Sequence, residues 1–213
     1  MRRYGGNLKG RTLMADEPQP LYPTLIPVAE ELRGPRVTLR RQRLSDAEDF
    51  FAALDASRAH LAPWLRFTDH ILTLDDARHV IICDESSWLL RQALRFAIRH
   101  NSTSEYLGGV DLHHVDWDIR AFEIGYWLRA GADGHGYMTE AVGLAVDYCF
   151  TDPHLAFNKA IIRCDARNTR SAAVAERLGF TREALLRADS RGKDGSLVDE
   201  LVYGRLRAGV TSQ

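Results

Sequence analysis

The sequence is poor in cysteine and contains no long apolar run. Its 213 residues include three cysteines, Cys83, Cys149 and Cys164, whose number is odd and whose spacing matches no metal or redox motif. We therefore expect buried thiols in a reducing compartment, which predicts a cytoplasmic protein. No run of about 18 apolar residues is present, so we predict no transmembrane helix and no membrane partner.

The sequence is also poor in lysine, with 3 lysines against 25 arginines, yet its net charge is only −1. A general nucleic-acid-binding protein usually has a basic excess, so we predict no nucleic-acid partner. The 45% apolar and 27% charged residues are typical of a folded chain and exclude a disordered one. At this length one domain is the default.

Proline is scarce except near the N-terminus, where five of the seven prolines come before residue 36. Repeated proline opposes helices and central strands. We predict a flexible proline-rich tail over 1–35, a folded domain over 36–207 and a frayed C-terminus over 208–213. The basic residues at the start are not followed by an apolar segment, which argues against a secretory signal, and a start at Met14 is an open alternative.

Hydrophobic periodicity predicts an α+β fold with the order β–α–α–β–β–β–α–β–α–β–β. Three strands over about 94–99, 106–117 and 121–129 have tight polar links and are expected to be antiparallel. A helix over about 137–150 then leads to a strand over 159–164, which makes one βαβ unit. The prediction is a central mixed, mostly antiparallel sheet of about seven strands with flanking helices.

A glycine pair, Gly134 and Gly136, lies between a predicted strand and the predicted helix. A helix start offers free N–H groups, and glycine lets the backbone approach a ligand closely. The loop therefore suits a phosphate or pyrophosphate, with a plain tight turn as the alternative. Thr139 replaces the third glycine of a dinucleotide motif and no Walker motif follows, which disfavours both nucleotide-binding folds.

Four motifs occur in an order typical of one enzyme family: Glu123-Ile-Gly-Tyr-Trp-Leu128, Gly134-His-Gly-Tyr-Met-Thr-Glu-Ala141, Asn168-Thr-Arg-Ser171 and Glu176-Arg-Leu-Gly-Phe180. Over residues 36–207 the sequence resembles the GNAT superfamily of N-acetyltransferases, and within it the ribosomal-protein N-acetyltransferases of the Rim type. It departs from that pattern at Gly131, where the family usually has Gln or Arg. One side-chain contact to the ligand is therefore expected to be absent.

The resemblance implies a GNAT-like fold and acetyl-CoA as the co-substrate. The pyrophosphate would bind the N–H groups of the glycine loop, and the pantetheine arm would lie along the strand over 121–129 like an added strand. That strand must then diverge from the strand over 159–164. The implied cofactor-binding residues are Tyr126, Trp127, Leu128, Gly134, His135, Gly136, Tyr137, Met138, Thr139 and Asn168.

Acetylation of an amine requires a base for the amine and a proton for the leaving thiolate. Glu123 lies where the family often has a carboxylate, and we predict that it is the base, acting through water. A solvent-facing glutamate at a strand end is the alternative. The Rim branch implies that Ser171 donates a proton to the thiolate, the alternative being an ordinary helix-start serine.

His113 and His114 are adjacent in a predicted strand, so we expect their side chains to face opposite ways. No set of His, Cys, Asp and Glu residues has recognisable metal spacing, and we predict no metal. Trp64, Trp88 and Trp117 could frame a substrate cleft, although most tryptophans belong to cores.

These features together predict an N-acetyltransferase that transfers an acetyl group from acetyl-CoA to a primary amine by direct attack in a ternary complex. The favoured acceptor is the N-terminal amine of a protein, with ribosomal proteins first. Two alternatives stay open: a small-molecule amine such as an aminoglycoside or polyamine, and a non-catalytic acyl-CoA-binding module. The resemblance also allows a homodimer, because Rim-type proteins can dimerise.

Overall fold

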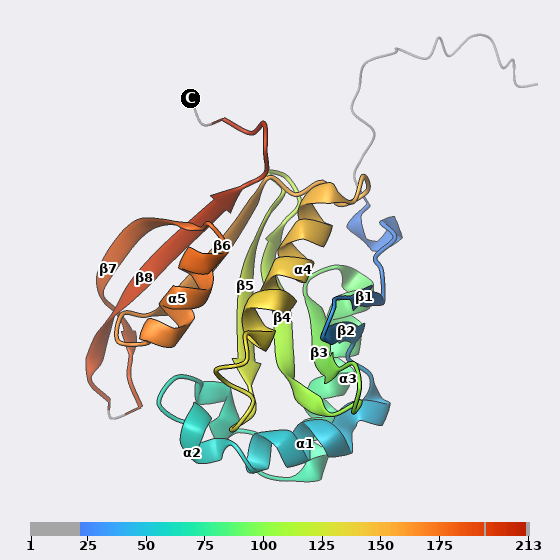
Figure 1. Ribbon diagram of the computed structural model, residues 1–213, viewed down its shortest axis with the longest axis vertical. Coiled ribbons are helices and arrows are strands. Elements are labelled where there is room, and N and C mark those ends of the chain that lie inside the picture. The colour runs from blue at the N-terminus through green and yellow to red at the C-terminus, as the bar shows by residue number, and fades with distance from the viewer. Residues whose placement is uncertain (1–21, 194, 212–213) are drawn as a thin grey trace, which may run out of the picture.

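The computed structural model describes residues 22–193 and 195–211, which form a twisted sheet with helices on both faces (Figure 1). Its described strands follow the order β1-β2-β3-β4-β5-β6-β8-β7. They are Glu31–Arg33 (β1), Val37–Arg41 (β2), Leu94–His100 (β3), Tyr106–Asp116 (β4), Ala121–Leu128 (β5), Lys159–Asp165 (β6), Thr181–Arg191 (β7) and Leu197–Leu206 (β8). All neighbours are antiparallel except β5 and β6. The predicted α+β class and mostly antiparallel sheet are confirmed.

Helices cover the two faces of the sheet unequally. They are Ala47–Asp55 (α1), Arg58–Leu61 (α2), Leu74–Leu90 (α3), Tyr137–Thr151 (α4) and Thr169–Arg177 (α5), with short 3-10 turns at Pro23–Leu25 (η1), Leu44–Asp46 (η2) and Arg66–Asp69 (η3). In Figure 1, α4 and α5 lie in front of the sheet, whereas α3 lies behind it. Within the described residues, none of the helices has the length and apolarity needed to cross a membrane.

Local sequence explains where the main helices begin. Thr73 caps α3, where its hydroxyl accepts a hydrogen bond from the Asp76 N–H and the Asp76 carboxylate bonds back to the Thr73 N–H. Asn168 caps α5 as the sequence predicts, because its side-chain oxygen accepts a hydrogen bond from the Ser171 N–H. The cap at α4 is different, since Gly136 supplies no side chain.

The βαβ unit β5–α4–β6 creates the opening in which the candidate site lies. β5 and β6 pair in parallel only where Ala121–Glu123 meets Lys159–Ile161. Beyond Glu123 this register ends, although β5 continues to Leu128 against β4 and β6 continues against β8. The predicted divergence of these two strands is therefore present, and no described strand pairs with this edge of β5 between Ile124 and Leu128.

Two apolar clusters hold the layers together. The larger one joins the sheet to α4 and α5 and contains fully buried residues such as Phe122, Phe157 and Val142. The smaller one joins the sheet to α1 and α3 through Phe50, Leu54 and Ile81. Burial of such side chains is the main source of stability, at about 1.5–3 kcal/mol each.

The thiols only partly follow the prediction. Cys149 and Cys164 are buried, but Cys83 is exposed on α3. Cys83 lies in an apolar run of the sequence, yet its side chain points away from the face of α3 that buries Ile81 and Trp88. The prediction of a buried thiol is therefore wrong for Cys83.

Residues 22–35 of the predicted tail over 1–35 belong to the fold. β1 pairs with β2 between Glu31 and Arg40, and Ile26 is buried. The prolines of this segment stand where proline is tolerated, for example at the first position of the turn η1 at Pro23. Residues 1–21 lie outside the described residues, as do 212 and 213 of the predicted C-terminal end.

Candidate functional site

A cleft of about 810 Å³ opens where β5 diverges from β6. It lies between β5, the start of α4 and α5, and residues of the α2 region close its far side. The structure brings to it nine of the ten predicted cofactor-binding residues and the predicted serine: Tyr126, Trp127, Leu128, Gly134, Gly136, Tyr137, Met138, Thr139, Asn168 and Ser171. Residues so far apart in the chain thus share one cavity.

The glycine loop presents backbone rather than side chains to this cleft. Gly134 and Gly136 have φ values of 81° and 77°, in the left-handed region that favours glycine. Gly136 is the N-cap of α4 and makes no side-chain cap, so the first N–H groups of α4 have no capping side chain to bind. A helix start in this state is suited to an anion such as a phosphate.

Arg36, which sequence reasoning missed, holds the glycine loop in place although it lies near the other end of the domain sequence. Its Nε donates to Glu140 Oε2 at 2.7 Å and its Nη1 donates to the His135 carbonyl at 2.7 Å. The imidazole of His135 stacks on Tyr137 at 5.5 Å and does not line the cleft. A residue 104 positions away gives no spacing signal, so only the fold reveals the pair.

Tyr126 and Ser171 form a hydroxyl pair on the cleft wall. The Tyr126 hydroxyl donates to the Ser171 carbonyl at 3.1 Å and lies 3.0 Å from Ser171 Oγ. Burial raises the pKa of Tyr126 despite the hydrogen bond with Ser171, so both hydroxyls keep their protons at neutral pH. The pair can therefore supply a proton to an anion formed beside it.

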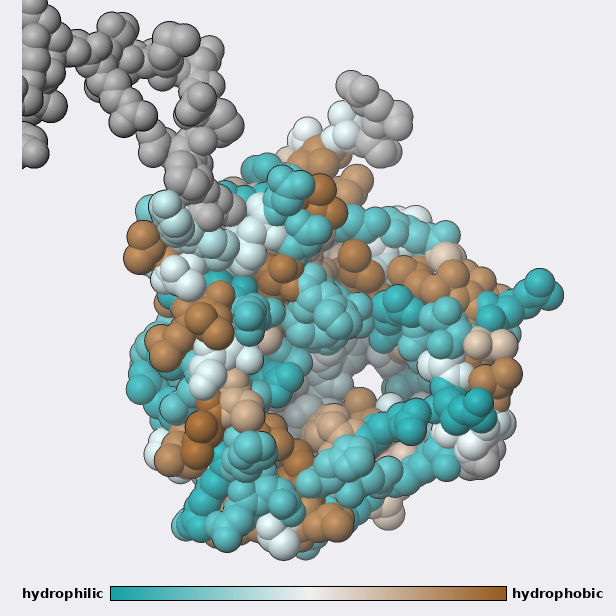
Figure 2. Space-filling model, turned by 180° about the vertical axis from the view of Figure 1, so that it is seen from behind, coloured by the Kyte–Doolittle hydropathy of each residue, from teal (hydrophilic) through white to brown (hydrophobic). Residues whose placement is uncertain are grey.

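A second cavity of about 430 Å³ shares Leu65, Tyr126 and Trp127 with the first. It lies on the sheet face that α1 and α3 cover, and Figure 2 views the molecule from this side and shows a hollow near the centre. Most of its walls are apolar. Its polar lining consists of Gln42, His70, Asp84, Arg95, Asp111 and His113.

Charged side chains of alternating sign line part of this second cavity. Arg95 forms ion pairs with Asp84 and, at 3.1 Å between Nε and Oδ1, with Asp111. His113 Nδ1 lies 3.4 Å from Asp111 Oδ2. Burial raises the pKa of Asp84 to about 7 although Arg95 opposes the shift. Sequence reasoning missed Asp84 and Arg95, because each looks like an ordinary solvent-facing residue of its element.

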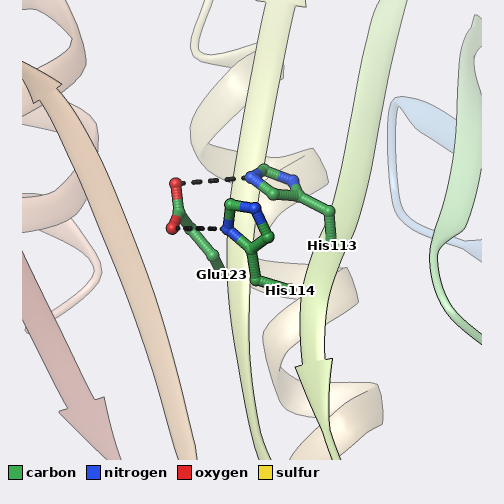
Figure 3. Close-up of side chains that lie close together, drawn as sticks. All are labelled: His113, His114 and Glu123. Atoms are coloured by element: carbon green, nitrogen blue, oxygen red, sulfur yellow. Dashed lines mark hydrogen bonds and ion pairs between the residues drawn. The ribbon is translucent and has the colours of Figure 1, made fainter. Parts of the chain in front are cut away.

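His113 and His114 converge on Glu123, contrary to the prediction that they face apart (Figure 3). His113 Nε2 lies 3.3 Å from Glu123 Oε1, and His114 Nδ1 lies 3.2 Å from Glu123 Oε2. The register between β4 and β5 shifts after His113, and His114 has a φ of 47°. This bulge breaks the alternation on which the prediction relied.

Hydrogen bonds within this cluster shift the pKa values of His113 and Glu123. Burial alone would lower the pKa of His113, but hydrogen bonds to Asp111 and Glu123 outweigh it and raise this pKa to about 9. Burial alone would raise the pKa of Glu123, but hydrogen bonds from His113 and His114 hold it below its usual range. His113 is therefore cationic and Glu123 anionic at neutral pH.

Histidine and carboxylate are also ligand types for divalent cations, and the ligand atoms of His113, His114 and Glu123 lie within 4.8 Å of one another. Sequence spacing does not mark this cluster, because the bulge brings together side chains that a regular strand would separate. Here the two imidazoles bind the carboxylate directly at hydrogen-bond distances.

The remaining predicted residues divide between site and core. Glu123 lines neither cavity, and its side chain is only 18% exposed, so it is not the solvent-facing glutamate of the alternative. Trp64 lines the first cavity. Trp88 packs edge-to-face on Phe96 and belongs to the core, whereas Trp117 is half-buried and packs on Phe157 at the edge of the core.

Comparison with known proteins gives a consistent result. Residues 36–181 match the family model described as an acetyltransferase (GNAT) domain. The chain is 31% identical over 182 residues to the uncharacterized N-acetyltransferase p20 of Bacillus licheniformis, which covers 84% of this chain and 97% of the relative. It is 30% identical over 173 residues to the putative ribosomal N-acetyltransferase YdaF of Bacillus subtilis, with 78% and 88% covered.

Solved structures share the fold at lower identity. RimL, a ribosomal L7/L12 α-N-protein acetyltransferase in complex with coenzyme A, matches with a TM-score of 0.77 at 21% identity, over 83% of this chain and 98% of that one. The ribosomal-protein-S5-alanine acetyltransferase from Vibrio fischeri matches with a TM-score of 0.76 at 21% identity, over 85% and 99%.

Proposed function

This chain belongs to the GNAT family of acetyltransferases and is an acetyl-CoA-dependent N-acetyltransferase, and from this premise we propose that its acceptor is the N-terminal amine of a protein, with ribosomal proteins as the first candidates. The observation that carries the proposal is that the two cavities share Tyr126 and Trp127 in their linings. A cofactor in the first cavity and an amine in the second would meet there.

Acetyl-CoA would bind in the first cavity. Its pyrophosphate would accept hydrogen bonds from the N–H groups at Gly134 and the start of α4, where no side-chain cap competes. The pantetheine arm would pair with the edge of β5 beyond Glu123, which β6 leaves open. Asn168 also lines this cavity, although its side chain caps α5.

The acceptor would bind in the second cavity. Phe50, Ile71 and Val80 make much of its wall apolar, while the carboxyl groups of Asp84 and Asp111 offer hydrogen-bond acceptors to an amine. One amine beside an apolar side chain fits this lining better than a polyhydroxylated aminoglycoside, which would leave many hydroxyls against hydrocarbon. The name of the relative YdaF supports the same acceptor class.

The reaction would proceed by direct attack of the neutral amine on the thioester carbonyl. A backbone N–H near Tyr126 or Trp127 would stabilise the oxyanion, and Glu123 would receive the amine proton indirectly, because it lines neither cavity. When the C–S bond breaks, the Ser171 hydroxyl would give its proton to the thiolate and regain one through Tyr126.

The test is thiol release from acetyl-CoA with a panel of acceptors. We expect turnover with peptides that have a free N-terminus, and none with the same peptides after N-terminal acetylation, a spermidine-type polyamine or an aminoglycoside. Ser171→Ala should lower kcat by about 100-fold or more, since general acid catalysis typically contributes about 100- to 10,000-fold. Ser86→Ala, which removes an exposed hydroxyl of α3, is the matched control and should leave kcat unchanged.

Turnover with small amines alone would replace the proposed acceptor with the small-molecule alternative. Wild-type kcat in Ser171→Ala would exclude the serine as proton donor while leaving the acceptor class unaffected.

A further inference from the structure

We propose that His113, Glu123 and His114 form a proton exit path that carries the proton of the acceptor amine from the second cavity to solvent. This inference rests on the proposed function, since it assigns a role to side chains beside the acceptor cavity. It makes Glu123 an intermediate carrier rather than a base in contact with the amine, and it makes His114 the outlet.

The three side chains connect the cavity with the surface. His113 lines the second cavity, where its Nδ1 lies 3.4 Å from Asp111 Oδ2. Its Nε2 faces Glu123 Oε1 at 3.3 Å, and Glu123 Oε2 faces His114 Nδ1 at 3.2 Å. His114 is 77% exposed, so its other nitrogen can reach water. Figure 3 shows the carboxylate bridging the two imidazoles.

A bulge in the backbone of β4 makes this connection possible. On a regular strand His114 would lie on the face opposite to His113, but the bulge in β4 and the φ of 47° at His114 bring both rings to Glu123. A left-handed conformation at a residue other than glycine costs about 1–3 kcal/mol. Gly125 leaves room for the His113 ring, because a Cβ at this position would lie 3.2 Å from His113 Cε1.

Each proton step balances. As the amine nitrogen bonds to the acetyl carbon, its proton passes to Nδ1 of a neutral His113, and the Nε2 proton of His113 passes to Glu123. Glu123 then protonates His114 at Nδ1, and His114 releases its Nε2 proton to water. Glu123 is again a carboxylate, and both imidazoles return to their first tautomer by exchange with water between turnovers.

The path requires a neutral His113, so its rate should rise with pH. The charged groups around the path come from four strands and one helix: Asp111 and His114 on β4, Glu123 on β5, Arg95 on β3, Arg163 on β6 and Asp84 on α3. Asp111 and Glu123 keep His113 protonated up to a pKa of about 9. We therefore expect kcat to increase up to about pH 9 and then to level off.

The experiment is chemical rescue of His114→Gln, with peptide acceptor, weak buffer, constant ionic strength and EDTA to remove metal ions. We expect kcat to fall about 100-fold, the low end for a lost acid–base group, with the KM for acetyl-CoA unchanged. Added imidazole should restore most of kcat, since it can take a proton from Glu123. His154→Gln, which changes an exposed histidine outside both cavities, should have the kcat of wild type, with and without imidazole.

A second measurement does not depend on turnover: NMR titration of the His113 ring in wild type and in Glu123→Gln. We expect titration near pH 9 in wild type and a clearly lower pKa in the variant. Wild-type kcat in His114→Gln, a loss that imidazole does not restore, or no difference between the two titrations would overturn the path. Absence of thiol release by wild type with every amine would instead contradict the proposed function, and the titration would still decide the coupling.

Discussion

Asp84 is the residue at which burial acts most directly on charge. Its side chain is 7% exposed, in the wall of the second cavity, and burial raises its pKa to about 7. Arg95 lies between Asp84 and Asp111, so one guanidinium serves two carboxylates. The carboxylate of Asp84 is thus only partly compensated, and its ionisation near neutral pH costs folding free energy.

This cost predicts a pH dependence of stability. The pKa of Asp84 is higher in the folded protein than its ordinary value of 3.8, so the protonated side chain contributes to the free energy of unfolding. This contribution is fully present below pH 4 and is lost as pH rises through 7. The loss is at most about 4 kcal/mol, the equivalent of three pKa units. The side chain of Asp84→Asn cannot ionise, so this variant should not lose that stability. The difference in free energy of unfolding, variant minus wild type, should therefore grow from pH 4 to 8 when both are measured by denaturant titration.

Asp75→Asn, an exposed carboxylate of the same helix, is the control and should give a curve parallel to wild type. A parallel curve for Asp84→Asn would mean that Arg95 compensates the buried charge completely.

The elements differ in how far the sequence predicts them. The helix α4, its glycine start and the strand β6 follow from periodicity and turn residues, and the divergence of β5 from β6 was expected from the cofactor it should hold. β1 could not be predicted, because its three residues lie between prolines and are too few to show a hydrophobic alternation. The strand also pairs on one side only, with β2. The bulge at His114 is equally hidden, since an extra residue in one strand is defined only by its partner strand.

The glycine loop permits a matched test at the scale of one element. Gly131 and Gly134 have nearly the same left-handed φ, 85° and 81°, and a Cβ would meet nothing within 4 Å at either. Alanine should therefore cost each about 1 kcal/mol of stability. Only Gly134 lines the first cavity, so Gly134→Ala alone should weaken acetyl-CoA binding, by about tenfold or 1.4 kcal/mol.

Thermal unfolding and calorimetric titration with acetyl-CoA measure the two effects separately. An equal change of Kd in both variants would indicate that loop strain, and not contact with the ligand, controls binding.

At the scale of the molecule, the sheet separates two chemical environments. Backbone N–H groups at the start of α4 face the first cavity, and the carboxylates Asp84 and Asp111 line the second. Both cavities are lined by Tyr126 and Trp127, which belong to the motif 123–128 recognised in the sequence. The second cavity is also lined by residues of α3 and β3, and no sequence motif marked these.

The contribution of residues 22–35 to this architecture can be measured by deletion. Arg91 donates two hydrogen bonds to the Ile26 carbonyl, at 3.0 and 2.8 Å, and the Ala29 N–H donates to the Tyr148 hydroxyl at 2.7 Å. A chain that begins at residue 36 loses these bonds, β1 and the burial of Ile26. We expect it to be roughly 4 kcal/mol less stable, about 2 from the apolar side chain and about 1 from each group left unpaired.

A chain that begins at residue 22 keeps every one of these contacts and is the matched control. Denaturant unfolding should place it with the full chain, and the chain from residue 36 well below both. Acetyl-CoA binding should survive in all three, because Arg36 and the glycine loop it holds are retained. Equal stability of the chains from 22 and from 36 would contradict the assignment of this segment to the folded sheet and restore the domain boundary that the prolines suggest.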